Sequence, residues 1–128
     1  MIIKVISIEN IILFHEKIIK ETGGSGGIRD IRLIESALNR PFMTYDGIEL
    51  YSSNIEKIAV TTYSLINNHG FVDGNKRIGV AVMLLLLKLN KLMIKYTQNE
   101  LIDLGLMAAE GTINEKDIMN WIKKHIIE

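Results

Sequence analysis

The fold of this chain is decided by residues 78–89, Ile78-Gly79-Val80-Ala81-Val82-Met83-Leu84-Leu85-Leu86-Leu87-Lys88-Leu89, which would be apolar on nearly every face of a helix. A helix that is apolar all round usually forms the buried centre of a helical bundle. The run is too short to cross a membrane, because a spanning helix needs about 20 apolar residues. The sequence therefore predicts a bundle that is built around this segment.

Helical periodicity predicts further helices on both sides of this segment, because apolar residues recur there every three or four positions. We expect these helices at residues 10–21, 31–38, 55–67, 98–110 and 115–127. Four of them are preceded by residues that are good N-caps, namely Asp30, Asn54, Thr97 and Asn114.

Residues 40–53 lack helical periodicity, and Tyr45-Asp46-Gly47 within them is a turn signal that can close a short β-hairpin. The expected fold is all-α, with a bundle of about six helices and a short β-hairpin before the central helices. A chain of 128 residues can bury a core of its own, so we expect a single domain over residues 1–128. The segment Gly23–Gly27 ends the first helix and is either a flexible connector or a functional loop.

Composition and charge exclude several classes of protein. Lys and Arg together number 15, as do Asp and Glu, so no overall positive charge supports direct DNA binding. Because the chain has no cysteine, it cannot use a disulfide scaffold, a thiolate metal site or a cysteine nucleophile. The first residues show no secretion signal, and we expect a soluble cytoplasmic protein without a membrane partner.

The polar loop directly before residue 78 carries the candidate chemistry. It reads His69-Gly70-Phe71-Val72-Asp73-Gly74-Asn75-Lys76-Arg77. The N-terminus of a helix presents unpaired backbone N–H groups and the positive end of the helix dipole. Small residues there, such as Gly74 and Asn75, let a ligand approach the backbone. The loop therefore predicts an anion site that suits phosphate.

Charged residues beside this helix end point to the same ligand. Lys76 and Arg77 would oppose the helix dipole at a cost of about 0.3–1 kcal/mol each, a conflict that a bound anion relieves. An arginine can hold two phosphate oxygens at once. Asp73 would repel the phosphate unless Mg²⁺ bridges the two, and its alternative role is a simple N-cap. His69 is placed to act as a general base, with a structural role as the alternative.

The segment 69–77 resembles the active-site signature of the Fic/Doc superfamily, which runs His, any residue, Phe, any residue, Asp or Glu, Gly or Ala, Asn, Gly or Lys, Arg. Residues 23–30, 33–38 and 40–41 resemble the amino-terminal half of Doc-like (death-on-curing) toxins, so the resemblance covers most of the chain. It implies a Fic-type helical bundle. Lys76 stands where typical adenylylating Fic enzymes carry Gly, and Val80 stands where their longer signature has a second Arg. Both features favour the Doc branch.

The resemblance to Doc implies a protein Ser/Thr kinase-type phosphotransferase that is the toxin of a type II toxin–antitoxin system. Such an enzyme would use ATP and Mg²⁺, move the γ-phosphate to a threonine of elongation factor Tu, and so block translation. The residues by themselves indicate only phosphate transfer. A nucleotidyl (AMP) transferase and a non-catalytic partner-binding module are the alternatives.

The resemblance also implies a role for each residue of the loop. His69 would activate the acceptor hydroxyl, and Asp73 would hold Mg²⁺ and help to orient His69. The phosphates would be bound by Gly74, Asn75, Lys76 and Arg77. The hairpin around Thr44, Tyr45, Asp46 and Gly47 would be a flap that positions the target chain by strand pairing. No internal inhibitory motif is evident, so we expect a separate antitoxin whose disordered segment folds on binding.

Four side chains outside these roles have simpler interpretations. Phe71 is expected to anchor the loop with a buried ring. His15 is expected to be packed in the core or to lie at the surface. Arg29 and Arg40 flank turns from which they could reach the pocket, but surface ion pairs are the favoured interpretation for both.

Overall fold

The computed structural model describes residues 2–127, and over these residues the chain is mostly helical. The elements follow in the order α1 (Ile8–Thr22), α2 (Ile31–Asn39), the short 3₁₀ helix η1 (Arg40–Phe42), β1 (Thr44–Tyr45), β2 (Ile48–Glu49), α3 (Asn54–Asn67), α4 (Asn75–Leu89), α5 (Gln98–Glu110) and α6 (Glu115–His125). The predicted all-α bundle of about six helices, with a hairpin before the central helices, is confirmed.

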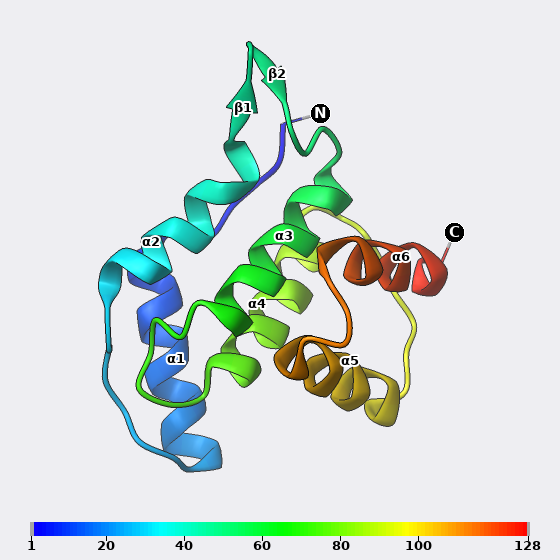
Figure 1. Ribbon diagram of the computed structural model, residues 1–128. Helices are drawn as coiled ribbons and strands as arrows, with labels where there is room; N and C mark the ends of the chain where they lie inside the picture. Colours follow the sequence, from blue (N-terminus) through cyan, green and yellow to red (C-terminus); the bar gives the residue numbers. More distant parts are fainter. Residues whose placement is uncertain (1, 128) are drawn as a thin grey trace.

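Helices α3 and α4 form the centre of the bundle and lie side by side (Figure 1). Helices α1 and α2 cover one side of this pair, and α5 and α6 cover the other. Gly79 on α4 permits close packing on α3, because a Cβ there would clash with Ile66 Cγ1 and lie 3.2 Å from Thr62 O. The core between the helices contains the buried apolar residues Ile11, Ile34, Ile58, Leu65, Ile66, Ile78, Val82, Met83, Leu86, Leu104, Ile118 and Ile122.

The apolar segment that decides the fold is the body of α4, but one edge of it faces solvent. Ile78, Val82 and Met83 are fully buried, whereas Leu85 and Leu89 are 40% and 41% exposed. The prediction of a buried central helix is therefore correct for the faces of α4 that pack on α1, α3 and α5, and not for its outer edge. None of the helices within residues 2–127 is both long and apolar enough to span a bilayer.

Side-chain caps determine where most of the helices begin. Asp30, Thr97 and Asn114 accept hydrogen bonds from backbone N–H groups of the following turn, as predicted. For α3 the cap is Ser53 and not the predicted Asn54. The Ser53 hydroxyl accepts from the backbone N–H three residues further on at 3.1 Å, so Asn54 becomes the first helical residue.

Helix α6 ends at His125, two residues earlier than the periodicity predicts, because the chain after it pairs with residues 93–95. Ile126 forms an antiparallel bridge with Ile94, and the Ile127 N–H donates to Met93 O at 2.9 Å. These backbone partners take the place of helical ones. The pairing attaches the last described residues to the segment between α4 and α5.

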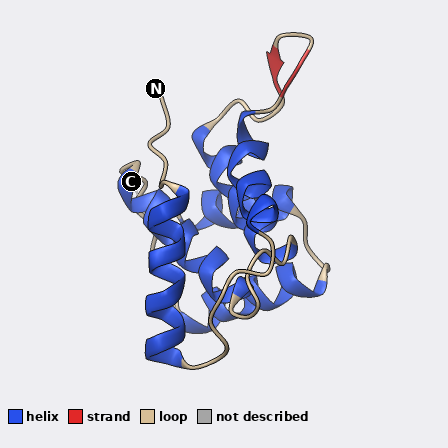
Figure 2. Cartoon of the chain, turned by 90° about the vertical axis from the view of Figure 1, so that its left-hand side faces the viewer, coloured by secondary structure: helices blue, strands red, loops and turns tan. Residues whose placement is uncertain are grey.

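Strands β1 and β2 form the predicted hairpin, in which Tyr45 pairs with Ile48. Asp46 (φ 52°) and Gly47 (φ 77°) both adopt left-handed backbone, which is the geometry of a two-residue type I′ turn. The hairpin projects from the bundle at the N-terminal end of α3 (Figures 1 and 2). The side chains of Tyr45 and Ile48 are exposed.

Candidate active site

The loop of residues 68–74 connects the end of α3 to the start of α4. Its anchor is Phe71, whose ring is buried as predicted and stacks on the His15 ring of α1 with the centroids 3.8 Å apart. The Asn75 side chain forms two hydrogen bonds with the backbone of Phe71. Its Nδ2 donates to Phe71 O and its Oδ1 accepts from the Phe71 N–H, both at 3.0 Å, and these two bonds bracket Phe71. The amide of Asn75, which the signature assigns to phosphate binding, therefore shapes the loop.

A second segment, residues 27–30, runs antiparallel to this loop. Ile28 and Phe71 form an isolated bridge. The backbone N–H groups of Arg29 and Asp30 both donate to Gly70 O, at 2.8 and 3.0 Å. Residues 27–30 and the loop, which are about 40 positions apart in the sequence, thus lie side by side. Together they form the rim of the candidate site.

The N-terminus of α4 has no side-chain cap. Its N-cap residue is Gly74, which adopts left-handed backbone (φ 77°, ψ 18°) and has no side chain to offer. The first turn of α4 contains no acidic residue, and Lys76 and Arg77 stand there instead. Helix-end N–H groups and two cations are therefore gathered at one place, which is the arrangement that binds anions.

Asp73, directly before Gly74, carries an ionised carboxylate. Its Oδ2 accepts from the Ser25 N–H at 3.1 Å, and its Oδ1 accepts from the Gly74 N–H at 2.8 Å. These two hydrogen bonds, led by that of Ser25, hold the pKa of Asp73 below its usual value, and the Arg77 guanidinium 3.8 Å away adds to the effect. Because the side chain is 47% exposed, the carboxylate is open to a cation.

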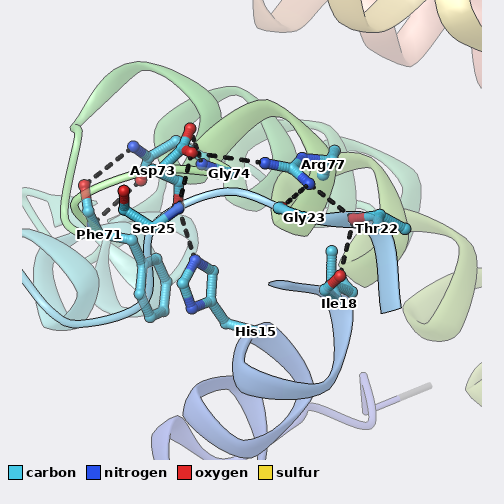
Figure 3. A network of polar contacts seen from close by, with 10 residues as sticks. His15, Ile18, Thr22, Gly23, Ser25, Phe71, Asp73, Gly74 and Arg77 are labelled. Carbon is cyan, nitrogen blue, oxygen red and sulfur yellow. Dashed lines mark hydrogen bonds and ion pairs between the residues drawn. The ribbon is translucent and has the colours of Figure 1, made fainter. Parts of the chain in front are cut away.

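The glycine segment Gly23–Gly27 lies across the same end of α4 (Figure 3). Arg77 Nη1 donates to Thr22 Oγ1 at 2.6 Å and to Gly23 O at 2.7 Å. Gly24 lies so close to this guanidinium that a Cβ there would be 2.9 Å from Nη2. These contacts hold the segment in place, so they argue against the flexible connector, one of its two sequence interpretations. A phosphate that binds Arg77 has to compete with the two oxygens that now hold it.

His69 lies at the exposed rim of the loop and has a left-handed backbone, with φ 54°. This conformation costs a residue other than glycine about 1–2 kcal/mol, so its neighbours have to hold it there. Its carbonyl accepts a hydrogen bond from Arg29 Nε at 2.6 Å. Among the residues that the structure describes, no hydrogen bond joins the His69 ring to Asp73. No direct contact therefore supports the predicted role of Asp73 in orienting His69.

The hairpin does not reach this loop. Thr44, Tyr45, Asp46 and Gly47 lie at the N-terminal end of α3, whereas His69 follows its C-terminal end (Figure 1). The 14 residues of α3 separate the two by about 20 Å, at a rise of about 1.5 Å per residue. This placement gives no support to the predicted role of the hairpin in positioning a target at the signature.

Two side chains that support the loop, His15 and Arg29, were not predicted from the sequence to do so. His15, predicted to be packed or at the surface, is 1% exposed, and its Nε2 lies 2.7 Å from Asp73 O. A signal for it was present, since His15 follows the core residue Ile11 by four positions and so shares a face of α1 with it. Arg29, expected in a surface ion pair, instead binds loop carbonyls. Arg40 does form an ion pair, as expected.

A groove of about 360 Å³ opens beside the signature, between α1, α4 and α5. Lys76 and Arg77 line it together with Thr22 and Gln98, and the rest of its wall is mostly apolar. The apolar part comes from Ile18, Val80, Ala81, Leu84, Leu101 and Ile102. A second cavity, of about 330 Å³, lies between the N-terminal segment and α2, and none of residues 69–77 lines it.

The model of the Fic/DOC family matches residues 5–87, which include α1, α2, α3, the loop and most of α4. This chain belongs to the Fic/Doc family. The resemblance that residues 69–77 carry is thereby confirmed. The protein Toxin Doc of Mycolicibacterium smegmatis is 33% identical over 93 residues, which are 73% of this chain and 67% of that protein.

The Fic/Doc match and the groove overlap only in part. The loop, the N-terminus of α4 and the glycine segment all lie within the matched residues. The α5 wall of the groove, with Leu101, Ile102 and Gly105, lies beyond residue 87. The family match therefore covers the loop and the N-terminus of α4 but not the α5 wall of the groove.

Proposed function

We propose that this protein is the toxin of a type II toxin–antitoxin system and that it transfers phosphate from ATP to a hydroxyl group of a protein. The observation that carries the proposal is the uncapped N-terminus of α4, with Lys76 and Arg77 in its first turn and the ionised Asp73 beside it. Amides and cations suit the phosphates, and the carboxylate suits a metal ion. Similarity to Toxin Doc supports a toxin, and membership in the Fic/Doc family supports a transferase.

Asp73 fits a magnesium ion that is shared with a nucleotide. Mg²⁺ commonly binds one or two carboxylates together with phosphate oxygens and water. Within residues 2–127 no three acidic or histidine side chains gather, so the ion would depend on the phosphates as well as on Asp73. Bound there, it would neutralise phosphate charge during transfer.

The groove between α1, α4 and α5 favours transfer of the γ-phosphate over transfer of AMP. Its apolar walls at Val80, Leu84 and Leu101 suit a nucleoside, and Lys76 and Arg77 line it while belonging to the signature. With the nucleoside in the groove, the triphosphate would extend toward the loop and bring its γ-phosphate nearest the acceptor. A triphosphate tail that pointed into the groove would meet an apolar side chain at position 80. An AMP transferase is the second candidate, because the same helix end could bind its phosphates.

The chemistry of transfer needs a base and a stabiliser of charge. His69 would accept the proton of the acceptor hydroxyl as that oxygen attacks the γ-phosphorus and ADP leaves. Arg77 and the N-terminal amides of α4 would stabilise the charge on the transferred group. Positioning and charge stabilisation account for most of the catalysis in phosphoryl transfer.

The acceptor in this proposal is a threonine of elongation factor Tu, as in the Doc branch that the signature resembles. Its modification would block translation, and a cognate antitoxin would hold the toxin inactive. The segment that lies beside the loop is Gly23–Arg29, so we assign the positioning of the acceptor chain to this segment and not to the hairpin. Ile28 and Val72, both exposed, flank the rim where that chain would lie.

Intact-mass spectrometry tests the proposal. Purified elongation factor Tu is incubated with this protein, ATP and Mg²⁺, and the variant His69→Ala serves as the control. The expected result is a gain of one phosphate that the variant does not produce. A gain of AMP would replace the kinase by the second candidate. No gain, either on this factor or in whole bacterial lysate, would refute the proposed transfer.

A further inference from the structure

The backbone around His69 is held by one residue from another part of the chain. Arg29 Nε donates to His69 O at 2.6 Å, and Arg29 Nη2 lies 3.5 Å from Asn68 O. The backbone N–H of Arg29 donates to Gly70 O at 2.8 Å. Arg29 thus binds three consecutive carbonyl groups, and the middle one belongs to the residue with the left-handed backbone.

We infer that Arg29 is a positioning residue for His69. By binding the peptide groups on both sides of His69, its guanidinium holds the left-handed backbone. The backbone conformation in turn sets the direction in which the imidazole points. The inference rests on the proposed function, in which that imidazole accepts the proton of the acceptor hydroxyl. A guanidinium suits this task because its donors lie at fixed angles in one plane, whereas a lysine ammonium is a single point of charge.

The loop has other anchors, so its folding does not depend on Arg29. Phe71 is buried and is bracketed by Asn75. Asn68 Nδ2 donates to Leu33 O at 3.0 Å, which ties the start of the loop to α2. The side chain of Arg29 is itself exposed. Its removal should therefore free the backbone of His69 and leave the bundle intact.

Arg32 provides a matched control on the same stretch of chain. Its side chain is 84% exposed and forms an ion pair with Asp30 at 3.1 Å. In the described part of the chain it has no hydrogen bond to the loop. The variant Arg32→Ala therefore removes the same charge three residues further along the chain, at the start of α2, without releasing His69.

Steady-state kinetics of transfer to the acceptor test the inference first. In Arg29→Ala, kcat should fall about 10- to 100-fold, because a displaced base loses its alignment, while KM for ATP should change less than about twofold. Arg29→Lys should recover part of the lost kcat, and Arg32→Ala should stay within about twofold of the wild type. Thermal unfolding should show the same midpoint for all four proteins. Wild-type kcat in Arg29→Ala, or a joint loss of kcat, ATP affinity and melting temperature, would overturn the inference.

Nuclear magnetic resonance gives a second readout that needs no acceptor. The Cα and Cβ shifts of His69 report its backbone conformation in the wild type and in each variant. They should move away from left-handed values in Arg29→Ala and keep them in Arg32→Ala. Unchanged shifts in Arg29→Ala would contradict the role of Arg29. If the wild type transfers no group to any acceptor, the proposed function fails, while these shifts still decide whether Arg29 holds His69.

Discussion

The N-terminus of α4 differs from those of α5 and α6 in how its first backbone N–H groups are satisfied. Every helix leaves backbone N–H groups without partners in its first turn. In α5 and α6, capping boxes satisfy two of those groups and place a carboxylate at the positive end of the dipole, Thr97 with Glu100 and Asn114 with Asp117. In α4 the N-cap is a glycine, and the first turn carries cations.

This difference leaves the first turn of α4 without the side-chain acceptors that α5 and α6 have. Glu100 and Asp117 place a carboxylate within the first turn of α5 and α6, whereas at α4 the nearest carboxylate, Asp73, precedes the helix and accepts from the N–H of the N-cap residue Gly74. In our proposal a bound phosphate would supply the charge that the first turn of α4 lacks. The loop before α4 is stabilised from the inside instead, by the stacking of Phe71 on His15 and by the bracket that Asn75 forms. The comparison can be tested by changing each kind of helix end in turn.

The largest effect is expected from Arg77→Ala, because it removes the main cation from the end of α4. ATP affinity and the rate of transfer should fall about 100- to 1000-fold. Lys88→Ala, which removes a cation from the last turn of the same helix, should change both by less than about twofold. Calorimetric titration with Mg²⁺-ATP and transfer kinetics measure the two quantities. Equal ATP affinity in the two variants would show that α4 does not bind the nucleotide through this end.

A smaller effect is expected from alanine at two glycines with nearly equal backbone angles, Gly74 (φ 77°) and Gly111 (φ 79°). At Gly111 a Cβ meets no atom within 4 Å, so the variant should lose about 1 kcal/mol for its left-handed backbone alone. At Gly74 a Cβ would lie 3.0 Å from Ile19 Cδ1 and 3.3 Å from His15 Nε2, so crowding should add about 1–2 kcal/mol.

Urea unfolding of both variants measures these losses, and transfer should fall only in Gly74→Ala. Equal losses of stability would mean that the loop before α4 is free to relax, and that its packing on α1 does not hold it in place.

The smallest effect is expected at the start of α5, in acid. Hydrogen bonds from His125 and from the Thr97 N–H lower the pKa of Glu100 from 4.5 to about 2. Because this pKa is lower in the folded protein, the ionised carboxylate stabilises the fold above pH 4.5, and that contribution disappears as the pH falls toward 2. The effect is modest because the side chain is about half exposed.

The variant Glu100→Gln tests this dependence. Its urea midpoint should change less between pH 4.5 and pH 2 than that of the wild type. Parallel pH profiles for the two proteins would show that the hydrogen bond from His125 does not stabilise the charged form of Glu100.

Much of the fold could be predicted from the sequence because it depends on near neighbours. The caps at Asp30, Thr97 and Asn114 act within three residues, and the turn of the hairpin depends on the backbone of two residues, Asp46 and Gly47. The prediction for α3 erred by one residue, because Ser53 and Asn54 are adjacent residues that both cap helices well.

The helices, the turn of the hairpin and the signature at residues 69–77 could be predicted without a structure, because the interactions behind each of them span only a few positions. The surroundings of the signature depend instead on contacts between distant parts of the chain. His15 lies 58 positions from Asp73, and Arg29 lies 40 positions from His69, distances over which no periodicity or propensity relates two residues. Packing of α1 and α2 on the central helices brings the segment after α1 to the loop, while the length of α3 keeps the hairpin at the other end.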